Sequence, residues 1–450
     1  MPETKLPGPR GVEQVACLRR LFREPQPVLD DLRDRYGPVC GFGFGPVRMA
    51  IVGDPAALRD LFAAPVEQFR WGHRFNVLGF VTGSRSIVVS DGPEHARRRA
   101  AVQGAFGRRR LHGWIPTIVE QTDHALDDLL RCAAAGEVVD LYPVVRALVL
   151  EVTVRAFFGA RFAGRAPEVG RLFRRPQAYL ESPAVRQIPH PLPFTARARV
   201  REDRRALDAL IDGEIAAIRA APTEDPRDVL EALVMEGTLD DAEIRDQVVT
   251  LIGAGFDTTT ASLAWMLWCA ASAPGVWPAL RAEADEQLGA LDAADPPARD
   301  AALLARLDFA NRVMRETLRL HPAGVLSPRE AVVDVEVAGH RIPRGTLVLW
   351  SAHLAGRDPT AWPDPLRFDP DRFRDPTEEQ ERLARDAWVP FGRGARSCIG
   401  FALAQMELTL MISRLAQRLD VAPTRTETPR PQGMVVNRPA GGVPMRVAAR

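Results

Sequence analysis

Apolar residues recur every three or four positions along most of the chain from residue 94 to residue 320. That spacing puts them on one face of an α-helix, so the pattern predicts a body that is helical almost throughout. The clearest periodicity lies in residues 118–130, 144–158, 204–218 and 309–320, and a last helix is predicted over residues 401–419.

Extended segments accompany this helical body. Residues 38–53 alternate apolar and small residues around glycines, which predicts a short hairpin, and strand-like patterns return at 332–337 and 347–350. Proline-rich irregular chain follows at 358–375. These patterns predict a mainly α fold with small β-sheets, the β-rich regions being peripheral at about 38–53 and 332–350.

Nothing in the sequence divides it into separate modules. No fixed-period repeat is present, and the linker-like segments 187–193, 292–299 and 424–433 are short. We therefore predict a single interwoven domain over residues 1–450, with a helical body at about 94–320.

Residues 248–271 form a long, mostly apolar stretch that resembles a membrane span in length. Asp257 argues against that interpretation, because a carboxylate near the centre of a span costs roughly 3 kcal/mol. The flank at 240–246 is acidic, and residues 1–10 lack the apolar core of a signal peptide or anchor. The sequence predicts a buried central helix in a protein without a membrane anchor.

The charge balance and the cysteines narrow the class of protein. Lysine and arginine number 59 against 58 aspartate and glutamate, a net charge of +1, so no basic field indicates nucleic acid and no acidic excess indicates disorder. The five cysteines are odd in number and scattered, unlike a secreted disulfide framework. We expect a small-molecule enzyme of the reducing cytoplasm.

The most specific feature is a glycine-rich loop at residues 391–400, which directly precedes the predicted last helix. Gly392, Gly394 and Gly400 permit backbone conformations and close approaches that a Cβ would forbid, so the loop can press against a planar cofactor. Cys398 lies near a helix N-terminus, where a thiol is favoured as thiolate. The other four cysteines, Cys17, Cys40, Cys132 and Cys269, are interpreted as core residues.

Two more residues of this loop suit an iron site. Phe391 is expected to cover the sulfur with an apolar ring, and Arg396 supplies a cation for a haem propionate. The complete pattern Phe-x-x-Gly-x-Arg-x-Cys-x-Gly resembles the haem-binding signature of the cytochrome P450 family, and further family motifs occur in order from His95 to Cys398. The resemblance implies a P450-like haem-thiolate fold with haem b, whose iron has Cys398 as its axial ligand, and the ligand loop at 391–400.

Ala254-Gly255-Phe256-Asp257-Thr258-Thr259 resembles the oxygen-activation motif of that family. The resemblance places Ala254 beside the cofactor and implies that Thr258 supplies a hydroxyl and Asp257 supplies protons through water. Taken alone, the same residues also fit a threonine bonded back to its helix and an aspartate in a buried ion pair.

Glu316 and Arg319 are three residues apart and share a helix face. In the family, a downstream arginine completes this pair, and Arg372 occupies the matching place. The resemblance therefore implies a structural triad of Glu316, Arg319 and Arg372, in which a charge left unpaired costs roughly 3 to 5 kcal/mol.

His95 and Arg99 are four residues apart and match the propionate clamp of the soluble family members, and Arg329 resembles another propionate ligand. A role as ordinary surface arginine remains the alternative for these cationic positions. Arg97 and Arg98 are expected to face solvent or a redox partner.

The resemblance implies a bacterial-type monooxygenase that hydroxylates or epoxidises a small apolar substrate with O2 and two externally supplied electrons. A ferredoxin with its reductase, or a flavin-type donor, would deliver them, because no dinucleotide fingerprint is found between a strand and a helix. The donor is expected to dock near Cys398, where Arg393, Arg97 and Arg98 would form a cationic patch. A haem-thiolate isomerase or dehydratase, and a ligand-binding haem protein without turnover, remain open.

A terpene, steroid, fatty acid or polyketide would suit an apolar pocket. The motifs at 368–373 and 388–391 resemble the eukaryote-like branch of the family and favour lipid-like substrates. Family topology indicates pocket residues in the segment 75–86, at Ile252 and Phe256, and at Val325 and Leu326, although apolar residues of this kind are also ordinary core residues.

Overall fold

The computed structural model describes residues 6–21, 23–44, 47–72, 76–134, 137–162, 164–289 and 302–450. These residues form two compact units, and neither is one continuous stretch of sequence. The first comprises Met1–His73, Arg312–Cys398 and Thr428–Gly441, and the second comprises Arg74–Asn311, Ile399–Glu427 and Gly442–Arg450. Because the segments of the units alternate along the chain, no single cut in the sequence separates them.

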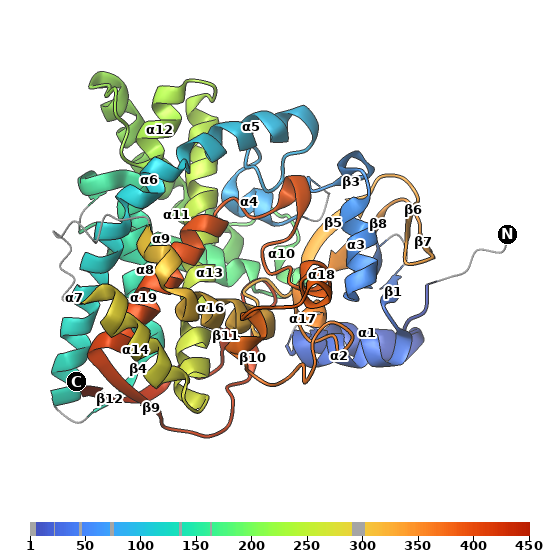
Figure 1. Ribbon diagram of the computed structural model, residues 1–450. Helices are drawn as coiled ribbons and strands as arrows, with labels where there is room; N and C mark the ends of the chain where they lie inside the picture. The colour runs from blue at the N-terminus through green and yellow to red at the C-terminus, as the bar shows by residue number, and fades with distance from the viewer. Residues whose placement is uncertain are drawn as a thin grey trace. The chain divides into compact units, whose positions relative to one another are not determined.

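The first unit holds most of the strands (Figure 1). Its helices are α1 (Gly11–Leu21), α2 (Pro25–Tyr36), α3 (Pro55–Ala63), most of α16 (Asp308–Leu320), α17 (Ala352–Ala355) and α18 (Glu378–Ala387). Its strands are β1 (Val39–Phe44), β2 (Val47–Val52), β3 (Phe69–Arg70), β5 (Ser327–Ala331), β6 (Val335–Val337), β7 (His340–Ile342), β8 (Thr346–Trp350), β10 (Pro431–Gln432) and β11 (Arg438–Pro439). Short 3-10 turns are η1 (Val66–Gln68), η4 (Pro370–Phe373) and η5 (Gly394–Arg396).

The main sheet of this unit joins the two predicted β-rich regions. Its strand order is β1-β2-β8-β5-β3, with β1 antiparallel to β2 and β2 parallel to β8. The predicted hairpin at 38–53 is confirmed, with Val39 opposite Val52. Strand β5, whose sequence Ser-Pro-Arg-Glu-Ala has no apolar alternation, was not predicted; it forms because β8 and β3 supply partners on its two sides.

The second unit is mainly helical. Its helices are α4 (Leu78–Thr82), α5 (Gly92–Ala105), α6 (Arg108–Gly113), α7 (Ile115–Ala134), α8 (Leu141–Phe158), α9 (Ala166–Leu180), α10 (Ala184–Gln187), α11 (Ala196–Ala220), α12 (Val229–Glu236), α13 (Asp241–Ser272), α14 (Val276–Leu288), α15 (Ala302–Arg306) and α19 (Phe401–Arg418). A 3-10 turn, η2 (Gly159–Phe162), and a three-stranded sheet of β4 (Val138–Asp140), β12 (Pro444–Ala449) and β9 (Leu419–Pro423) complete it. All predicted helical segments are confirmed, with boundaries shifted by a few residues.

Helix α13 is the buried central helix that the sequence predicted, and it packs on α8, α11, α12 and α19. It begins at Asp241, earlier than the apolar pattern from residue 248 indicated. The difference arises because its first turns carry buried polar residues. Gln247, for example, accepts a hydrogen bond from the Ile87 backbone N–H at 2.8 Å and donates one to the Arg85 carbonyl at 2.8 Å.

Within the described parts of the chain, no single helix has both the length and the apolar character needed to cross a membrane. Helices α13 and α14 reach the length and apolar character of a membrane span only when they are taken together, and the chain bends by 108° between them.

Candidate functional site

The ligand loop lies at the end of a chain segment of the first unit and presents an exposed thiol. The Cys398 backbone N–H donates to the Phe391 carbonyl at 2.8 Å, which closes the loop, and Cys398 is exposed. Gly392 and Gly394 have φ values of +63° and +69°, so the predicted need for glycine holds there. Gly400 has φ −84°, which any residue adopts, so the predicted conformational reason does not apply to it.

Two arginines of the first unit share one aromatic ring. Arg396 lies over Trp71 with its guanidinium carbon 4.0 Å from the ring centre, and Arg329 lies 5.2 Å from the same ring and also near Phe62 and Phe69. Burial, together with the like charge of Arg396, lowers the pKa of Arg329 to about 10. Among the described residues no carboxylate forms an ion pair with Arg329. A pair of like charges, one buried at Arg329 and one half-buried at Arg396, suits an anionic group, as a haem propionate would be.

The three residues of the predicted triad meet in the first unit. Glu316 accepts hydrogen bonds from Arg319 at 2.7 and 2.8 Å and from Arg372 Nε at 3.2 Å, and it also accepts the Asp369 backbone N–H at 2.8 Å. The side chains of Glu316 and Arg319 have no exposed surface. The remaining N–H groups of Arg319 donate hydrogen bonds to the backbone carbonyls of Gly356, Pro365 and Arg367. These contacts tie α16 to the irregular chain before the ligand loop.

Helix α5 of the second unit carries His95 and Arg99 on one face, as their spacing predicted. His95 is buried and Arg99 is half-buried. The expectation for Arg97 and Arg98 is wrong in part, because both pair with the buried carboxylate of Glu243 and the Arg98 side chain is only 11% exposed. A run of three arginines points in three directions around a helix, so the sequence alone cannot show which of them lies inward.

Helix α13 has an open strip in an otherwise buried surface. Ala254 is exposed, and Gly253, Gly255 and Thr258 are half-buried, whereas the residues on the other sides of the helix are buried. The Thr258 hydroxyl donates to the Ala254 carbonyl at 2.5 Å, so the back-bonded geometry left open by the sequence is present. The hydroxyl oxygen keeps its capacity to accept a hydrogen bond. This small-residue strip fits the flat face of a cofactor.

Asp257 is buried beside the open strip and faces an arginine that sequence reasoning missed. Arg146 of α8 lies 3.7 Å from an Asp257 carboxylate oxygen, stacks over the Phe256 ring at 4.4 Å and donates to Gln177 at 3.1 Å. The predicted acid therefore has an ion pair, as in the alternative that the sequence left open, although the Arg146 side chain is only half-buried. The signal for Arg146 was an arginine inside the apolar pattern of residues 144–158, which also contains Arg155.

Glu407 on α19 is a second acid that sequence reasoning missed. Its side chain is buried, and burial raises its pKa to about 8, although a hydrogen bond with Thr259 opposes the shift. Its Oε1 atom lacks a hydrogen-bond partner among the described residues. A lone glutamate in the apolar run that follows Cys398 was the available signal.

The predicted pocket residues are mostly core residues. Ile252 and Phe256 are fully buried and lie one turn apart on the side of α13 opposite Ala254, which is the environment of the ordinary core residues that the sequence left open as the alternative. Val325 is part of an apolar cluster of the first unit. Leu326 is half-buried and packs against the same cluster. Phe75 and the segment 292–299 lie outside the described residues.

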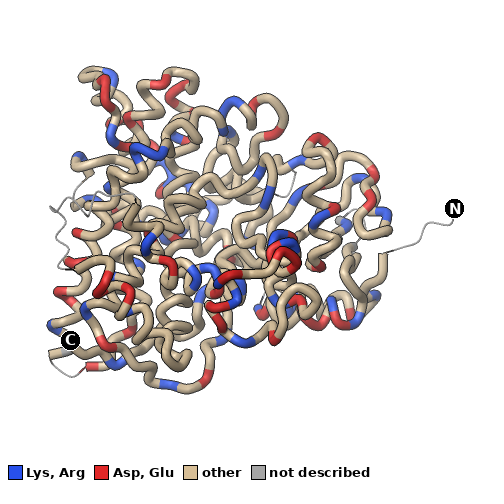
Figure 2. The backbone as a smooth tube through the Cα atoms, viewed as in Figure 1, with Lys and Arg blue, Asp and Glu red and all other residues tan. Residues whose placement is uncertain are grey.

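The charged groups near the ligand loop are largely paired. Arg393 Nη1 lies 3.0 Å from Asp386, and Asp386 also lies 3.4 Å from Arg59. Along the whole described chain the two signs of charge are interspersed, without a long block of either sign (Figure 2). Of the three residues of the predicted cationic patch, Arg393 pairs with Asp386, and Arg97 and Arg98 pair with Glu243.

Comparisons with known proteins agree with the resemblance. The family model described as Cytochrome P450 matches residues 7–443. The Mycobacterium tuberculosis protein named "Putative cytochrome P450 139" is 32% identical over 426 residues, which cover 91% of this chain and 95% of that one. Cyclooctatin synthase of Streptomyces melanosporofaciens is 34% identical over 375 residues, or 80% and 78% of the two chains. The solved structure titled "Retinoic acid bound cyanobacterial CYP120A1" covers 99% of both chains with a TM-score of 0.86 at 24% identity.

Proposed function

The chain belongs to the cytochrome P450 family, whose members are oxidoreductases of the monooxygenase type, and from that premise we propose that it uses O2 to hydroxylate or epoxidise a small apolar substrate. The ligand loop is the observation that carries the proposal. It presents an exposed thiol on a backbone closed by the bond from the Cys398 N–H to Phe391. In this proposal Cys398 ligates the iron of haem b.

Bound haem would supply the oxygen chemistry, and electron donation from a thiolate ligand favours cleavage of the O–O bond. The chain's own residues bind and orient the cofactor. Arg329 and Arg396 offer the anion site on Trp71, and His95 and Arg99 are assigned to the propionates as in the family. Gly400 and Phe391 belong to the loop that supports Cys398, and Ala254 is assigned to the cofactor face of α13.

Proton supply is assigned to Asp257 and Thr258. An Asp257 carboxylate oxygen lies 3.7 Å from the half-buried guanidinium of Arg146. Thr258 lies one residue further on the half-buried edge of the open strip. A proton taken up at the Asp257 carboxylate can then pass through water to the neighbourhood of the Thr258 hydroxyl, while the buried remainder of α13 excludes bulk solvent.

We expect Thr258→Ala to bind substrate normally but to lower the yield of product per electron pair by roughly tenfold or more, because an ordered proton acceptor and donor is lost. Peroxide release and product formation should both be measured against the consumption of the reduced nicotinamide cofactor that supplies the electrons. Thr260→Ala is the matched control, since its hydroxyl bonds back to the Phe256 carbonyl at 2.7 Å in the same way but is fully buried. Equal coupling in the two variants would remove Thr258 from proton delivery.

The substrate class remains part of the proposal. Terpenes, steroids, fatty acids and polyketides are the candidates, and the relative named cyclooctatin synthase supports testing a biosynthetic oxidation first. Two electrons are proposed to come singly from a ferredoxin with its reductase or from a flavin protein. Half-buried Arg393 and exposed Arg59, which both pair with Asp386, are two cations that such a donor would meet near the ligand loop.

The function is tested by omission. Candidate substrates are first screened by the shift they cause in the haem spin state, and product is then measured with O2, a reduced nicotinamide cofactor, ferredoxin and reductase, each left out in turn. The proposal requires product only in the complete mixture. Product without O2 or donor would indicate the isomerase or dehydratase alternative, and substrate binding without any product under all donors would indicate a ligand-binding haem protein.

A further inference from the structure

The first half of helix α5 has almost no apolar attachment to the second unit. The buried residues of α5 are His95, Ala101, Val102 and Ala105, so His95 is the single buried side chain before residue 100. Apolar burial therefore orients the second half of the helix but gives little preference for the rotation of the first half about its axis. Polar contacts must set that rotation.

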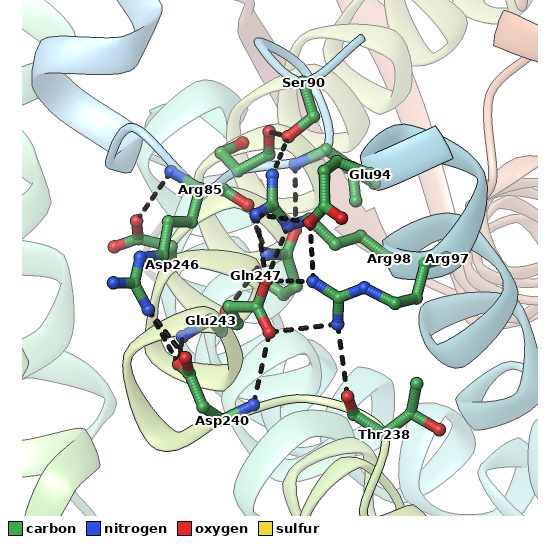
Figure 3. A network of polar contacts seen from close by, with 12 residues as sticks. Arg85, Ser90, Glu94, Arg97, Arg98, Thr238, Asp240, Glu243, Asp246 and Gln247 are labelled. Carbon is green, nitrogen blue, oxygen red and sulfur yellow. Dashed lines mark hydrogen bonds and ion pairs between the residues drawn. The ribbon is translucent and has the colours of Figure 1, made fainter. Parts of the chain in front are cut away.

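Those contacts converge on the carboxylate of Glu243, at the start of α13 (Figure 3). Glu243 Oε1 accepts from Arg97 Nη2 at 2.5 Å and from Arg98 Nε at 2.9 Å, and Oε2 accepts from Arg97 Nη1 at 3.1 Å. The Glu243 side chain is 6% exposed. The Arg97 hydrogen bonds, with those of Arg98, lower the pKa of Glu243 to about 2, so the pair is charged throughout the physiological range.

The position of this carboxylate is itself fixed. Glu243 accepts the Asp240 backbone N–H at 3.2 Å, while the Asp240 side chain accepts the Glu243 N–H at 2.8 Å, which forms a capping box. Arg97 also donates to the Thr238 carbonyl at 3.1 Å, and Arg98 donates to the buried Ser90 hydroxyl at 2.6 Å. The two arginines are thus held between the start of α13 and the chain that enters α5.

The direction of the anchored arginines determines the direction of the candidate cofactor ligands. His95 and Arg99 are separated by four residues and share a face, whereas Arg97 points about 180° and Arg98 about 80° away from that face around the same helix. A bidentate guanidinium–carboxylate contact allows little rotation. Fixing Arg97 and Arg98 on Glu243 therefore fixes where His95 and Arg99 point.

We propose that Glu243 is a positioning residue, which orients α5 so that His95 and Arg99 are held ready for the haem propionates. The proposal rests on the proposed function for the identity of the bound group. The anchoring of α5 stands on the contacts alone and is testable without haem.

The variant that tests the proposal is Glu243→Gln. Glutamine at the third helical position can still close the capping box, so the substitution removes mainly the charge that holds the two arginines. Glu94→Gln is the matched control, because Glu94 pairs with the same arginines at 2.7 and 3.1 Å but its side chain is 57% exposed. The readouts are the rate of haem transfer to excess apomyoglobin and the amide hydrogen exchange of residues 92–99 in the haem-free protein.

We expect Glu243→Gln to raise the haem-transfer rate roughly ten- to hundredfold, as loss of a supporting contact does at metal sites, and Glu94→Gln to raise it by less than about fivefold. Exchange at 92–99 should accelerate in the first variant only. In a His95→Ala/Arg99→Ala background, Glu243→Gln should add less than about a twofold increase, because coupled residues are not additive.

Equal exchange in Glu243→Gln and Glu94→Gln would overturn the anchoring of α5, whether or not haem binds. The same increase in haem transfer with and without His95 and Arg99 would show a general loss of stability and overturn the positioning role. If the unsubstituted protein takes up no haem, the proposed function fails and the positioning role with it, whereas the hydrogen-exchange comparison still decides the anchoring.

Discussion

Replacing Cys398 by serine is expected to abolish the strongly red-shifted absorption of the ferrous protein under carbon monoxide. That shift would require a thiolate ligand on the haem iron, and a serine hydroxyl does not ionise at neutral pH to replace it. The loop backbone should survive, because its closing bond from residue 398 to Phe391 uses main-chain atoms only. We therefore expect a folded protein with weakly held haem and no thiolate spectrum.

The matched control is Cys132→Ser, which makes the same change at a half-buried cysteine of α7. It should leave the spectrum intact. Absorption difference spectra of both variants, normalised to haem content, make the comparison. A thiolate spectrum retained in Cys398→Ser, or lost in Cys132→Ser, would contradict the assignment of the ligand.

Arg319→Leu is expected to lower the free energy of unfolding by about 3–5 kcal/mol. The substitution leaves the Glu316 carboxylate buried without its main partner, although Arg372 and the Asp369 N–H still contact it. Three backbone carbonyls also lose their donor. Because domains are stable by only about 5–15 kcal/mol in total, this loss removes a large share of the stability and should reduce the yield of haem-loaded protein.

Urea unfolding of the variant measures this effect. Arg374→Ala is the control, since Arg374 forms an ion pair with Asp371 in which both side chains are about half exposed, and its loss should change the unfolding free energy by about 1 kcal/mol or less. An Arg319→Leu variant as stable as this control would show that the buried triad does not hold the fold together.

The sequence predicted the features whose cause is local. The ligand loop was predictable because its glycines, arginine and cysteine lie within ten consecutive residues, and the long helices were predictable because apolar periodicity continues over several turns. Strand β5 and the true start of α13 were missed because both depend on distant partners. Gln247, for instance, is polar and yet buried, because the chain at Arg85 and Ile87 satisfies its amide.

In the candidate site, too, features with local causes were predicted and features that depend on distant partners were missed. Glu316, Arg319 and Arg372 come together as the family motif implied, but the neighbours that tune the remaining residues lie far away in the sequence. Arg146 faces Asp257 across two helices, more than a hundred residues apart. Which side of α13 is open was also undetermined, because Ile252 and Phe256 are as apolar as any pocket residue and differ from Ala254 only in direction.

The like charges of Arg329 and Arg396 on one tryptophan bear on how this protein matures in the cell. If a haem propionate binds these two groups, as proposed, it would relieve the repulsion between them and favour closure of the chain around Trp71. On the proposed function, folding and cofactor loading are then linked equilibria, and haem supply contributes to the fraction of chains that escape proteolysis. A shortage of haem would then appear first as a lower abundance of the protein, ahead of any accumulation of intact but empty enzyme.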